Sequence, residues 1–352
     1  MQLQNMARLK MAWALPEGRD NGVVLSSRVR LARNLKAYPF PSRAGPKALG
    51  AVLDSLFAAA RKTAPLAKAA YLKMSDLDPV DRLFLAERHL ISRALAQDPD
   101  AGGAVVGDRE ILSCMINEED HVRLQALDSG LCFRGLWGEL DSLDNEISSQ
   151  VEFAVHPQWG YLCACPTNAG TALRVSALLH LPGLTLTEQI NGVLEGLARV
   201  GVTARGFYGE GTRVLGDFYQ ISNAVSLGRS EADFIAGMES TASGLVAREV
   251  ETRRSIAAGP RKARLEDLVF RSLGILTHAR SISYEETLHH LSYLRLAVSM
   301  DWDVPVDMVA INELLVLAQP AHVQMSLGKE LPAAERDVHR ASLLRKKLGA
   351  AP

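Results

Sequence analysis

Residues 111–127 decide the fold, and they read ILSCMINEEDHVRLQAL. The apolar run 111–116 is typical of a buried strand. From Val122 to Ala126 apolar and polar residues alternate, which predicts a second strand. The turn between the strands carries Glu118, Glu119 and Asp120, and loops at strand ends are where a rigid scaffold presents functional groups. We interpret this turn as a site in which one acid acts as a base and another supports a metal ion. A solvated polar turn would give the same pattern.

The composition is that of an ordinary globular protein. The chain has 352 residues, of which 47% are hydrophobic and 22% charged, and its net charge is −1. The length suggests two domains, and the balanced charge argues against nucleic acid as a partner. No apolar run reaches bilayer-spanning length and the N-terminus does not resemble a signal peptide, so we expect no membrane association. The four cysteines lack metal-ligand spacing, which favours reduced thiols in a cytoplasmic protein.

Further strands and helices follow from the same periodicities. We expect strands at 23–33, 202–208 and 217–222, and a hairpin at 151–155 and 161–165. We expect helices at 49–57, from Asp78-Pro79 through Leu90, at 136–151, from Gly170-Thr171, at 190–197 behind a Thr185–Glu188 capping box, and from Ser230 through Leu245. Gly259-Pro260 is the best domain boundary, because the pattern beyond it is wholly helical.

Five arginines occur where a polyphosphate could bind. Arg28 and Arg30 alternate with apolar residues, so both project from one face of a strand. A bound phosphate would relieve their repulsion, although a solvated cationic edge would look the same. Arg123, Arg174 and Arg205 each lie at a strand end or a helix start. Arginines around a polyphosphate, with Mg²⁺ bridging its oxygens, would neutralise the charge of phosphoryl transfer. The sequence has no P-loop and no dinucleotide-binding motif.

Three other residues are candidates with plainer alternatives. Glu210 lies between two glycines, which is typical of a mobile loop, and with Glu119 it would suit a cationic acceptor. Cys165 precedes a tight turn, after which a helix N-terminus near Arg174 would attract an anion. A plain corner with a buried cysteine is the alternative. His89 lies beside an apolar helix face, where a structural histidine is the default interpretation.

Four blocks of the sequence resemble the signature segments of the phosphagen (guanidino) kinases, the ATP:guanido phosphotransferase family. They are Ser26–Arg30, Asn117–Arg123, Cys165–Thr171 and Arg205–Glu210, in the family's order and at its spacing. The chain is most similar to the bacterial protein-arginine kinase (McsB-type) branch. That similarity rests on Arg30–Leu35, Arg88–Ser92, Tyr208–Gly211, Gln220–Asn223 and Glu335–Asp337, and it extends over nearly the whole chain.

The resemblance implies an α+β fold: an antiparallel sheet flanked by helices, followed by an all-helical C-terminal domain. It implies a catalytic domain at 1–255 and a dimerisation and phosphoarginine-sensing domain at 261–352. It implies ATP and Mg²⁺ as cofactors, with Glu118 supporting the Mg²⁺ shell. Glu119 and Glu210 match the acids that hold the guanidinium, and Cys165 matches the active-site thiol. The residues expected to bind ATP are Ser26, Arg28, Arg30, His89, Arg123, Arg174 and Arg205.

Two departures from the phosphagen kinases bear on the substrate. Their N-terminal helical domain of about a hundred residues has no counterpart before the block that begins at Ser26, and an open site suits a protein-borne arginine. Leu178 stands where they often have a nucleotide-stacking histidine. The implied activity is phosphorylation of arginines exposed on proteins, which would mark them for Clp-type proteolysis and regulate stress-response repressors. A small-guanidino kinase and a catalytically silent phosphoarginine-binding adaptor are the alternatives. The implied partners are a second copy, a cysteine-rich activator protein, a repressor and a Clp-type ATPase.

Arg336 and Asp337 begin the last expected helix, behind Pro332. On general grounds they form a surface ion pair worth roughly 0–1 kcal/mol. The resemblance implies instead an allosteric phosphoarginine pocket, in which Arg336 meets the phosphate and Asp337 the guanidinium.

Overall fold

One eight-stranded sheet organises the molecule, in the order β2-β3-β4-β5-β1-β8-β10-β9 with every neighbouring pair antiparallel. The computed structural model describes residues 6, 10–206 and 214–349. The strands are β1 (Val24–Arg33), β2 (Ala70–Lys73), β3 (Gly103–Val106), β4 (Leu112–Ile116), β5 (Val122–Ser129), β6 (Val155–His156), β7 (Gly160–Tyr161), β8 (Leu173–His180), β9 (Val202–Arg205) and β10 (Phe218–Asn223).

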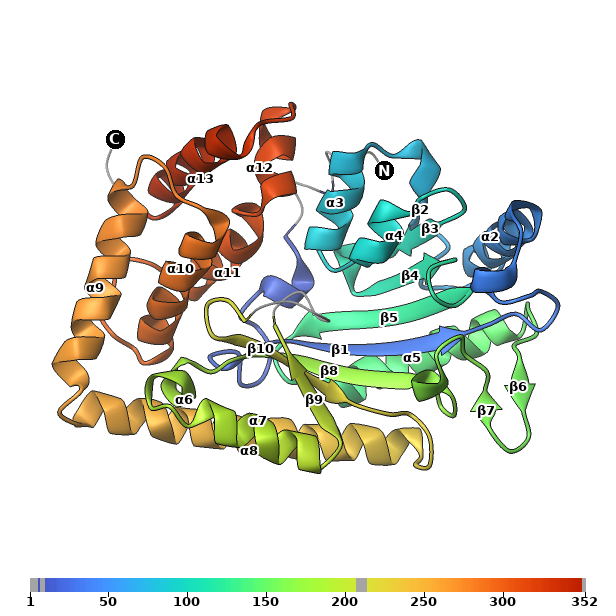
Figure 1. Cartoon of the computed structure of the whole chain (residues 1–352), viewed down its shortest axis with the longest axis horizontal. Coiled ribbons are helices and arrows are strands. Elements are labelled where there is room, and N and C mark those ends of the chain that lie inside the picture. Colours follow the sequence, from blue (N-terminus) through green and yellow to red (C-terminus); the bar gives the residue numbers. More distant parts are fainter. Residues whose placement is uncertain (1–5, 7–9, 207–213, 350–352) are drawn as a thin grey trace.

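Helices cover both faces of this sheet (Figure 1). They are α2 (Pro46–Arg61), α3 (Pro79–Glu87), α4 (Arg93–Gln97), α5 (Phe133–Ser148), α6 (Pro182–Leu186), α7 (Ile190–Arg199), α8 (Glu231–Ala258), α9 (Lys262–His278), α10 (Tyr284–Ser299), α11 (Met308–Leu317), α12 (Pro320–Leu327) and α13 (Ala333–Lys347). The α+β fold with a helical C-terminal region is therefore confirmed. No helix in the described part of the chain is long and apolar enough to cross a membrane.

The central strands form as the sequence predicts. β4 is buried at every position, as expected of its apolar run. On β1, β5 and β8 one set of alternating residues, including Val29, Leu124 and Val175, is fully buried in a single apolar cluster. The amphipathic helices α5, α7 and α8 run along this face of the sheet; in Figure 1 α7 and α8 lie at the bottom and α5 lies behind the strands. Burying their apolar sides there fixes the face to which each strand residue points.

The opposite face of the sheet is divided between helices and a polar region. At one end Leu127, Leu178 and Phe218 share an apolar cluster with residues of α9, α10, α11 and α13. These helices lie together at the left of Figure 1. In the register of the sheet, Leu127 is paired with Arg28 and Leu178 with Gln220. The polar region therefore begins directly beside the helical layer.

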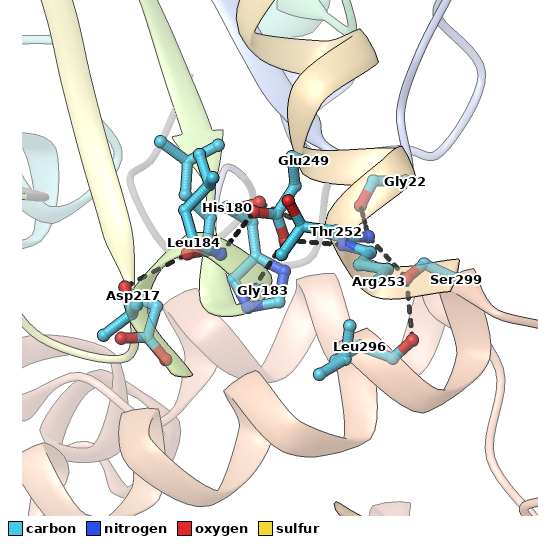
Figure 2. Close-up of polar contacts among 12 residues, drawn as sticks. Gly22, His180, Gly183, Leu184, Asp217, Glu249, Thr252, Arg253, Leu296 and Ser299 are labelled. Atoms are coloured by element: carbon cyan, nitrogen blue, oxygen red, sulfur yellow. Dashed lines mark hydrogen bonds and ion pairs between the residues drawn. The ribbon is translucent and has the colours of Figure 1, made fainter. Parts of the chain in front are cut away.

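A buried ion pair on α8 joins three parts of the molecule (Figure 2). Glu249 and Arg253 lie one turn apart, and Arg253 Nε donates to Glu249 Oε1 at 2.7 Å. The carboxylate of Glu249 also accepts the backbone N–H groups of Gly183 and Leu184, at 2.8 and 3.0 Å. Arg253 further donates to the carbonyl oxygens of Gly22 and His180 and to the hydroxyl of Ser299, at 2.9, 2.8 and 2.7 Å. The pair thus connects the N-terminal segment, β8 and α10.

One prediction about a site residue was wrong. Gly170-Thr171 does not start a helix, because residues 173–180 form β8 and place Arg174 inside the sheet. Strands β1 and β10 flank this segment on both sides and satisfy its backbone hydrogen bonds. The backbone has φ +101° at Gly170 and φ +54° at Ala172, so the chain turns here without becoming helical.

Two helix boundaries also differ from the predictions. The helix behind Asp78 ends at Glu87, because His89 adopts a left-handed conformation with φ +61°. The Thr185–Glu188 capping box does not form, since the Thr185 hydroxyl donates to the Leu181 carbonyl at 3.1 Å. The predicted hairpin is present but short, as β6 and β7.

Candidate active site

Strand register brings five arginines onto one face of the sheet. Arg28 and Arg30 share a face of β1 because they are two residues apart. The facing pairs on the neighbouring strands are Ala32 with Arg123, Arg30 with Arg174, and Gln220 with Arg205. The sequence identified each arginine separately. The order β5-β1-β8-β10-β9, which is not the order of the chain, brings them together.

These arginines line an open cavity of about 550 Å³ between the sheet and the segment that follows α3. Its polar lining consists of Arg28, Arg30, His89, Ser92, Arg93, Glu118, Glu119, Arg123, Gln125, Asn168, Arg174, Arg205 and Gln220. Cations dominate the lining, so a cavity of this size fits a polyphosphate ligand.

The arginine side chains are partly buried, and their guanidinium groups repel one another. Burial, followed by the charges of Arg174 and Arg123, lowers the pKa of Arg28 to about 10. Burial and the neighbouring arginines also lower the pKa of Arg30 well below its ordinary value, against the opposing effect of Glu118. Arg30 Nε is buried without a hydrogen-bond partner among the described residues. An anion in the cavity would relieve the repulsion and accept from this donor.

Glu119 lies on a turn that its neighbours hold rigidly. The Asp120 carboxylate is buried and accepts from Asn34 Nδ2 at 2.6 Å and from the Ala164 backbone N–H at 2.7 Å. The buried His121 ring accepts from the Leu35 backbone N–H at 3.0 Å. Glu119 itself is 42% exposed. The turn is therefore anchored on both sides while it presents one carboxylate to the cavity.

Arg123 is paired with two of the three acids of this turn. Its Nη1 lies 2.6 Å from Glu118 Oε2 and its Nη2 donates to Glu119 Oε2 at 3.0 Å. Arg174 is held in a similar way by Ser222 Oγ, at 3.1 Å. These contacts fix cationic groups and a carboxylate in one arrangement before any ligand is bound.

His89 and Ser26 lie deeper, next to the arginines. His89 is buried, and burial followed by the charges of Arg28 and Arg30 lowers its pKa to about 3, so the ring is neutral. Its left-handed backbone is held by Gln125, whose Nε2 donates to the His89 carbonyl at 2.8 Å. Ser26 does not line the main cavity but a recess of about 20 Å³ beside it, together with Leu178. Leu178 gives this recess an aliphatic wall, at the position where phosphagen kinases often have a nucleotide-stacking histidine.

The other two candidate catalytic residues differ in how far they can be described. Glu210 lies outside the described residues. Cys165 is half-buried, with Sγ 3.0 Å from Thr167 Oγ1, and it does not line the cavity, whereas its neighbour Asn168 does. Burial raises the pKa of Cys114 to about 12, and burial above all raises that of Cys132 to about 11 and that of Cys163 to about 12. These three thiols are therefore poor nucleophiles.

Sequence reasoning gave no role to five polar residues of the cavity, one of which is Ser92, the residue before α4. Gln125 could have been predicted from the sequence, since it lies two positions after Arg123 on the same strand and shares its face. Its Oε1 is buried and has no hydrogen-bond partner among the described residues. Arg93, Asn168 and Gln220 reach the cavity from α4, a turn and β10. Asn168 and Gln220 lie in segments that carry the family resemblance, whereas no local pattern identifies Arg93.

Arg336 lines a second cavity, of about 440 Å³, where α3 faces the segment from α12 to α13. Its Nη1 donates to the Leu331 carbonyl at 3.1 Å. Asp337 does not line this cavity, and its carboxylate accepts a short hydrogen bond from the buried Arg340. The acid that accompanies Arg336 in the cavity is Glu330. Arg340 pairs with one oxygen of the Asp337 carboxylate, whose side chain is still 30% exposed. The pairing of Asp337 with the guanidinium of a ligand stays a prediction.

Helix α3 touches both cavities. Pro79, Val80 and Leu83 line the second one, while Ala86 and the following His89 line the first. At the end of α3 the buried Glu87 accepts the backbone N–H groups that begin α12, from Ala321 at 2.8 Å and His322 at 3.0 Å. His322 Nδ1 also lies 2.7 Å from Glu87. The C-terminal helices are thus attached directly to the segment that forms one wall of the arginine-lined cavity.

Comparison with known proteins agrees with this arrangement. Residues 52–252 match the model of the ATP:guanido phosphotransferase C-terminal catalytic domain, and residues 262–352 match that of the protein-arginine kinase McsB C-terminal domain. The chain is 42% identical over 349 residues to a protein-arginine kinase of Halothermothrix orenii, covering 99% of both chains. It is 40% identical over 348 residues to one of Symbiobacterium thermophilum, covering 98% of both.

Solved structures share the fold. A duplicated taurocyamine kinase from Schistosoma mansoni with bound transition-state-analogue components matches with a TM-score of 0.60 and 23% identity, over 76% of this chain and 38% of that one. A lombricine kinase matches with a TM-score of 0.59 and 24% identity, over 72% of each chain. The two family models and the full-length relatives show that the chain belongs to the protein-arginine kinases, phosphotransferase enzymes of the ATP:guanido phosphotransferase family.

Proposed function

We propose that this protein transfers the γ-phosphate of ATP to arginine side chains of other proteins. The observation that carries the proposal is the register of β5, β1, β8, β10 and β9, which gathers five arginines around a cavity with Glu119 at its edge. The arginines suit a polyphosphate, and Glu119 suits a guanidinium. The names of the full-length relatives favour a protein-borne arginine over a free one.

The reaction needs a base, because an arginine guanidinium is protonated and has no nucleophilic nitrogen. In our proposal Glu119 and Glu210 hold the cation, aim one nitrogen at the γ-phosphorus and accept its proton. The N–P bond forms as the bond to the β–γ bridging oxygen breaks, and ADP leaves with that electron pair. Arg30, Arg123 and Arg174 stabilise the charge on the phosphoryl oxygens.

ATP and Mg²⁺ are the proposed cofactors. The donor set fits ATP, since partly buried arginines whose guanidinium groups repel one another surround the cavity. Among the described residues no three His, Cys, Asp or Glu side chains gather around a metal position. Kinase sites usually hold Mg²⁺ by one or two carboxylates and the substrate phosphates, and Glu118 is the carboxylate that we assign to this shell. The bound ion would neutralise charge on the β- and γ-phosphates.

Labelled ATP tests the proposal directly. We expect the purified protein to label an unfolded arginine-rich protein through a bond that acid cleaves, and not to label the same protein after its arginines have been blocked. Transfer to free arginine alone would identify a small-guanidino kinase. Absence of transfer to either would favour a phosphoarginine-binding adaptor.

The remaining assignments belong to the same proposal. Residues 1–255 form the catalytic part, and residues 261–352 pair two copies and sense phosphoarginine. Cys165 is the thiol of the active site. All four cysteines are unpaired in the structure, which suits a reducing compartment such as the cytoplasm. A cysteine-rich activator, a repressor and a Clp-type ATPase are the further partners, with a role in the stress response.

The second cavity supports a proposal for regulation. We assign the phosphate of a phosphoarginine to Arg336, near the N-terminus of α13, where helix dipole and cation favour an anion. Since α3 borders both cavities, occupation of this one would bias the wall of the active site. Coupling of this kind is typically about 1–3 kcal/mol, or about 5–150-fold.

Substitution of Arg336 tests this regulation. We expect phosphoarginine-containing protein to stimulate the parent enzyme, Arg336→Ala to abolish the stimulation, and Lys346→Ala on the same helix to retain it. Initial rates with and without pre-phosphorylated protein give the answer. If Arg336→Ala is stimulated as strongly as the parent, the cavity has no sensing role.

A further inference from the structure

Four large apolar side chains are exposed beside the active site. Val155 and Trp159 lie on the hairpin of β6 and β7, and Val225 and Leu227 lie on the loop after β10. Each is between 44% and 56% exposed. We call these four residues the hairpin patch. Exposed apolar residues gathered at one place mark interaction sites more often than single ones do.

Backbone contacts hold the hairpin and the loop together. Tyr161 N–H donates to the Gly170 carbonyl at 2.8 Å, and Thr171 N–H donates to the Ser226 carbonyl at 3.0 Å. A Cβ atom on Gly170 would lie 2.5 Å from the Ser226 carbonyl oxygen, so only glycine permits this close approach. The two segments that carry the hairpin patch are therefore joined through Gly170 and Thr171.

The same surface is fastened to the turn that carries Glu119. The Asp120 carboxylate receives the Ala164 backbone N–H at 2.7 Å, and Asn34 links Asp120 to the Leu162 carbonyl. Asn168, six residues after Leu162, lines the cavity itself. The hairpin is seen beyond the start of β8 at the right of Figure 1. The hairpin patch thus continues outward from the Glu119 side of the cavity.

A protein substrate must pass over this edge. Its arginine enters the cavity, while the backbone that carries the arginine stays outside and continues in both directions. An extended chain advances about 3.4 Å per residue, so residues within a few positions of the arginine come to lie beside the cavity. Apolar side chains among them would find the hairpin patch.

We propose that the hairpin patch binds apolar side chains that flank the target arginine in an unfolded or extended protein substrate. The inference rests on the proposed function, and it names the class of substrate preferred. Self-association of this chain through the patch is less favoured, because the surface area of four half-exposed side chains is far below the ~800 Å² that each partner buries in a standard interface.

Two peptides test the proposal, both with one central arginine and differing only in flanking leucine or serine residues. Trp159→Ser combined with Val155→Ser should raise the KM for the leucine peptide about tenfold. The KM for the serine peptide and for ATP should stay at the parent value. Phe270→Ser on α9, where the side chain is 51% exposed, is the matched control and should change none of the three.

A second pair of substitutions, Val225→Ser with Leu227→Ser, guards against misfolding of the hairpin and should give the same selective rise. Equal changes for both peptides, or no change, would overturn the proposal. So would a change in sedimentation with unaltered KM values, which would assign the patch to self-association. Fluorescence anisotropy of the labelled leucine peptide measures its binding to the protein independently of phosphate transfer. A parent that binds this peptide through the patch but transfers no phosphate would refute the proposed function and leave the docking site standing.

Discussion

Glu119→Gln is expected to lower the turnover number by a factor on the order of 10²–10⁴. The glutamine amide keeps the shape of the side chain but loses the negative charge and the basicity that the guanidinium reaction needs. In the structure Glu119 is held by Arg123 at 3.0 Å on a turn that Asp120 and His121 anchor. The substitution therefore changes the chemistry of one carboxylate without disturbing the fold.

Steady-state kinetics and calorimetry together check this result. The affinity for Mg·ATP should be kept, because the substitution removes a negative charge from beside Arg123 and no cation. Glu152→Gln is a suitable control, since Glu152 pairs with Lys36 at the exposed surface and should leave turnover unchanged. Turnover of the Glu119→Gln enzyme within a factor of two of the parent would refute the role given to Glu119.

Arg253→Leu is expected to destabilise the folded protein by about 3–5 kcal/mol, the usual cost of removing one partner from a buried ion pair. The change leaves Glu249 buried without its cation and removes the hydrogen bonds from Arg253 to the carbonyl groups of Gly22 and His180. Burial lowers the pKa of Arg253 while Glu249 raises it. The pairing with Glu249 therefore offsets the cost of burying the charge of Arg253.

The adjacent Arg254 provides the control, because it is exposed. Arg254→Leu should change stability by no more than about 0.5 kcal/mol. Urea unfolding of both variants, followed by circular dichroism, measures the difference. Equal midpoints for the two variants would mean that the contacts in Figure 2 contribute little to stability.

The individual strands could be predicted from the sequence because their side chains alternate. Arg28 and Arg30 share a face for that reason alone, and the burial of β4 follows from its apolar run. Arg174 was assigned to the right site on the wrong element. Its backbone partners on β1 and β10 are distant in sequence, and local signals near Gly170 suggested a helix.

Other features depend on contacts that no local pattern encodes. Arg93 reaches the cavity only because His89 reverses the chain after α3. Asp337 accepts a hydrogen bond from Arg340, one turn later on the same helix. The sequence alone does not show whether Asp337 pairs with Arg340 or with a ligand. The convergence of the arginines likewise required the order of strands in the sheet.

The apolar cluster beneath the C-terminal helices limits which C-terminal segments can be exchanged between members of this family. Leu127 and Leu178 belong to strands that also carry arginines of the cavity, and Phe218 belongs to the strand of Gln220, yet all three pack against α10 and its neighbours. A chimera that takes residues 262–349 from a relative would therefore have to bring matching side chains at these three sheet positions. The helices and these sheet residues must therefore change together in evolution. They are nevertheless far apart in the sequence, since more than forty residues separate Phe218 from Lys262, where α9 begins.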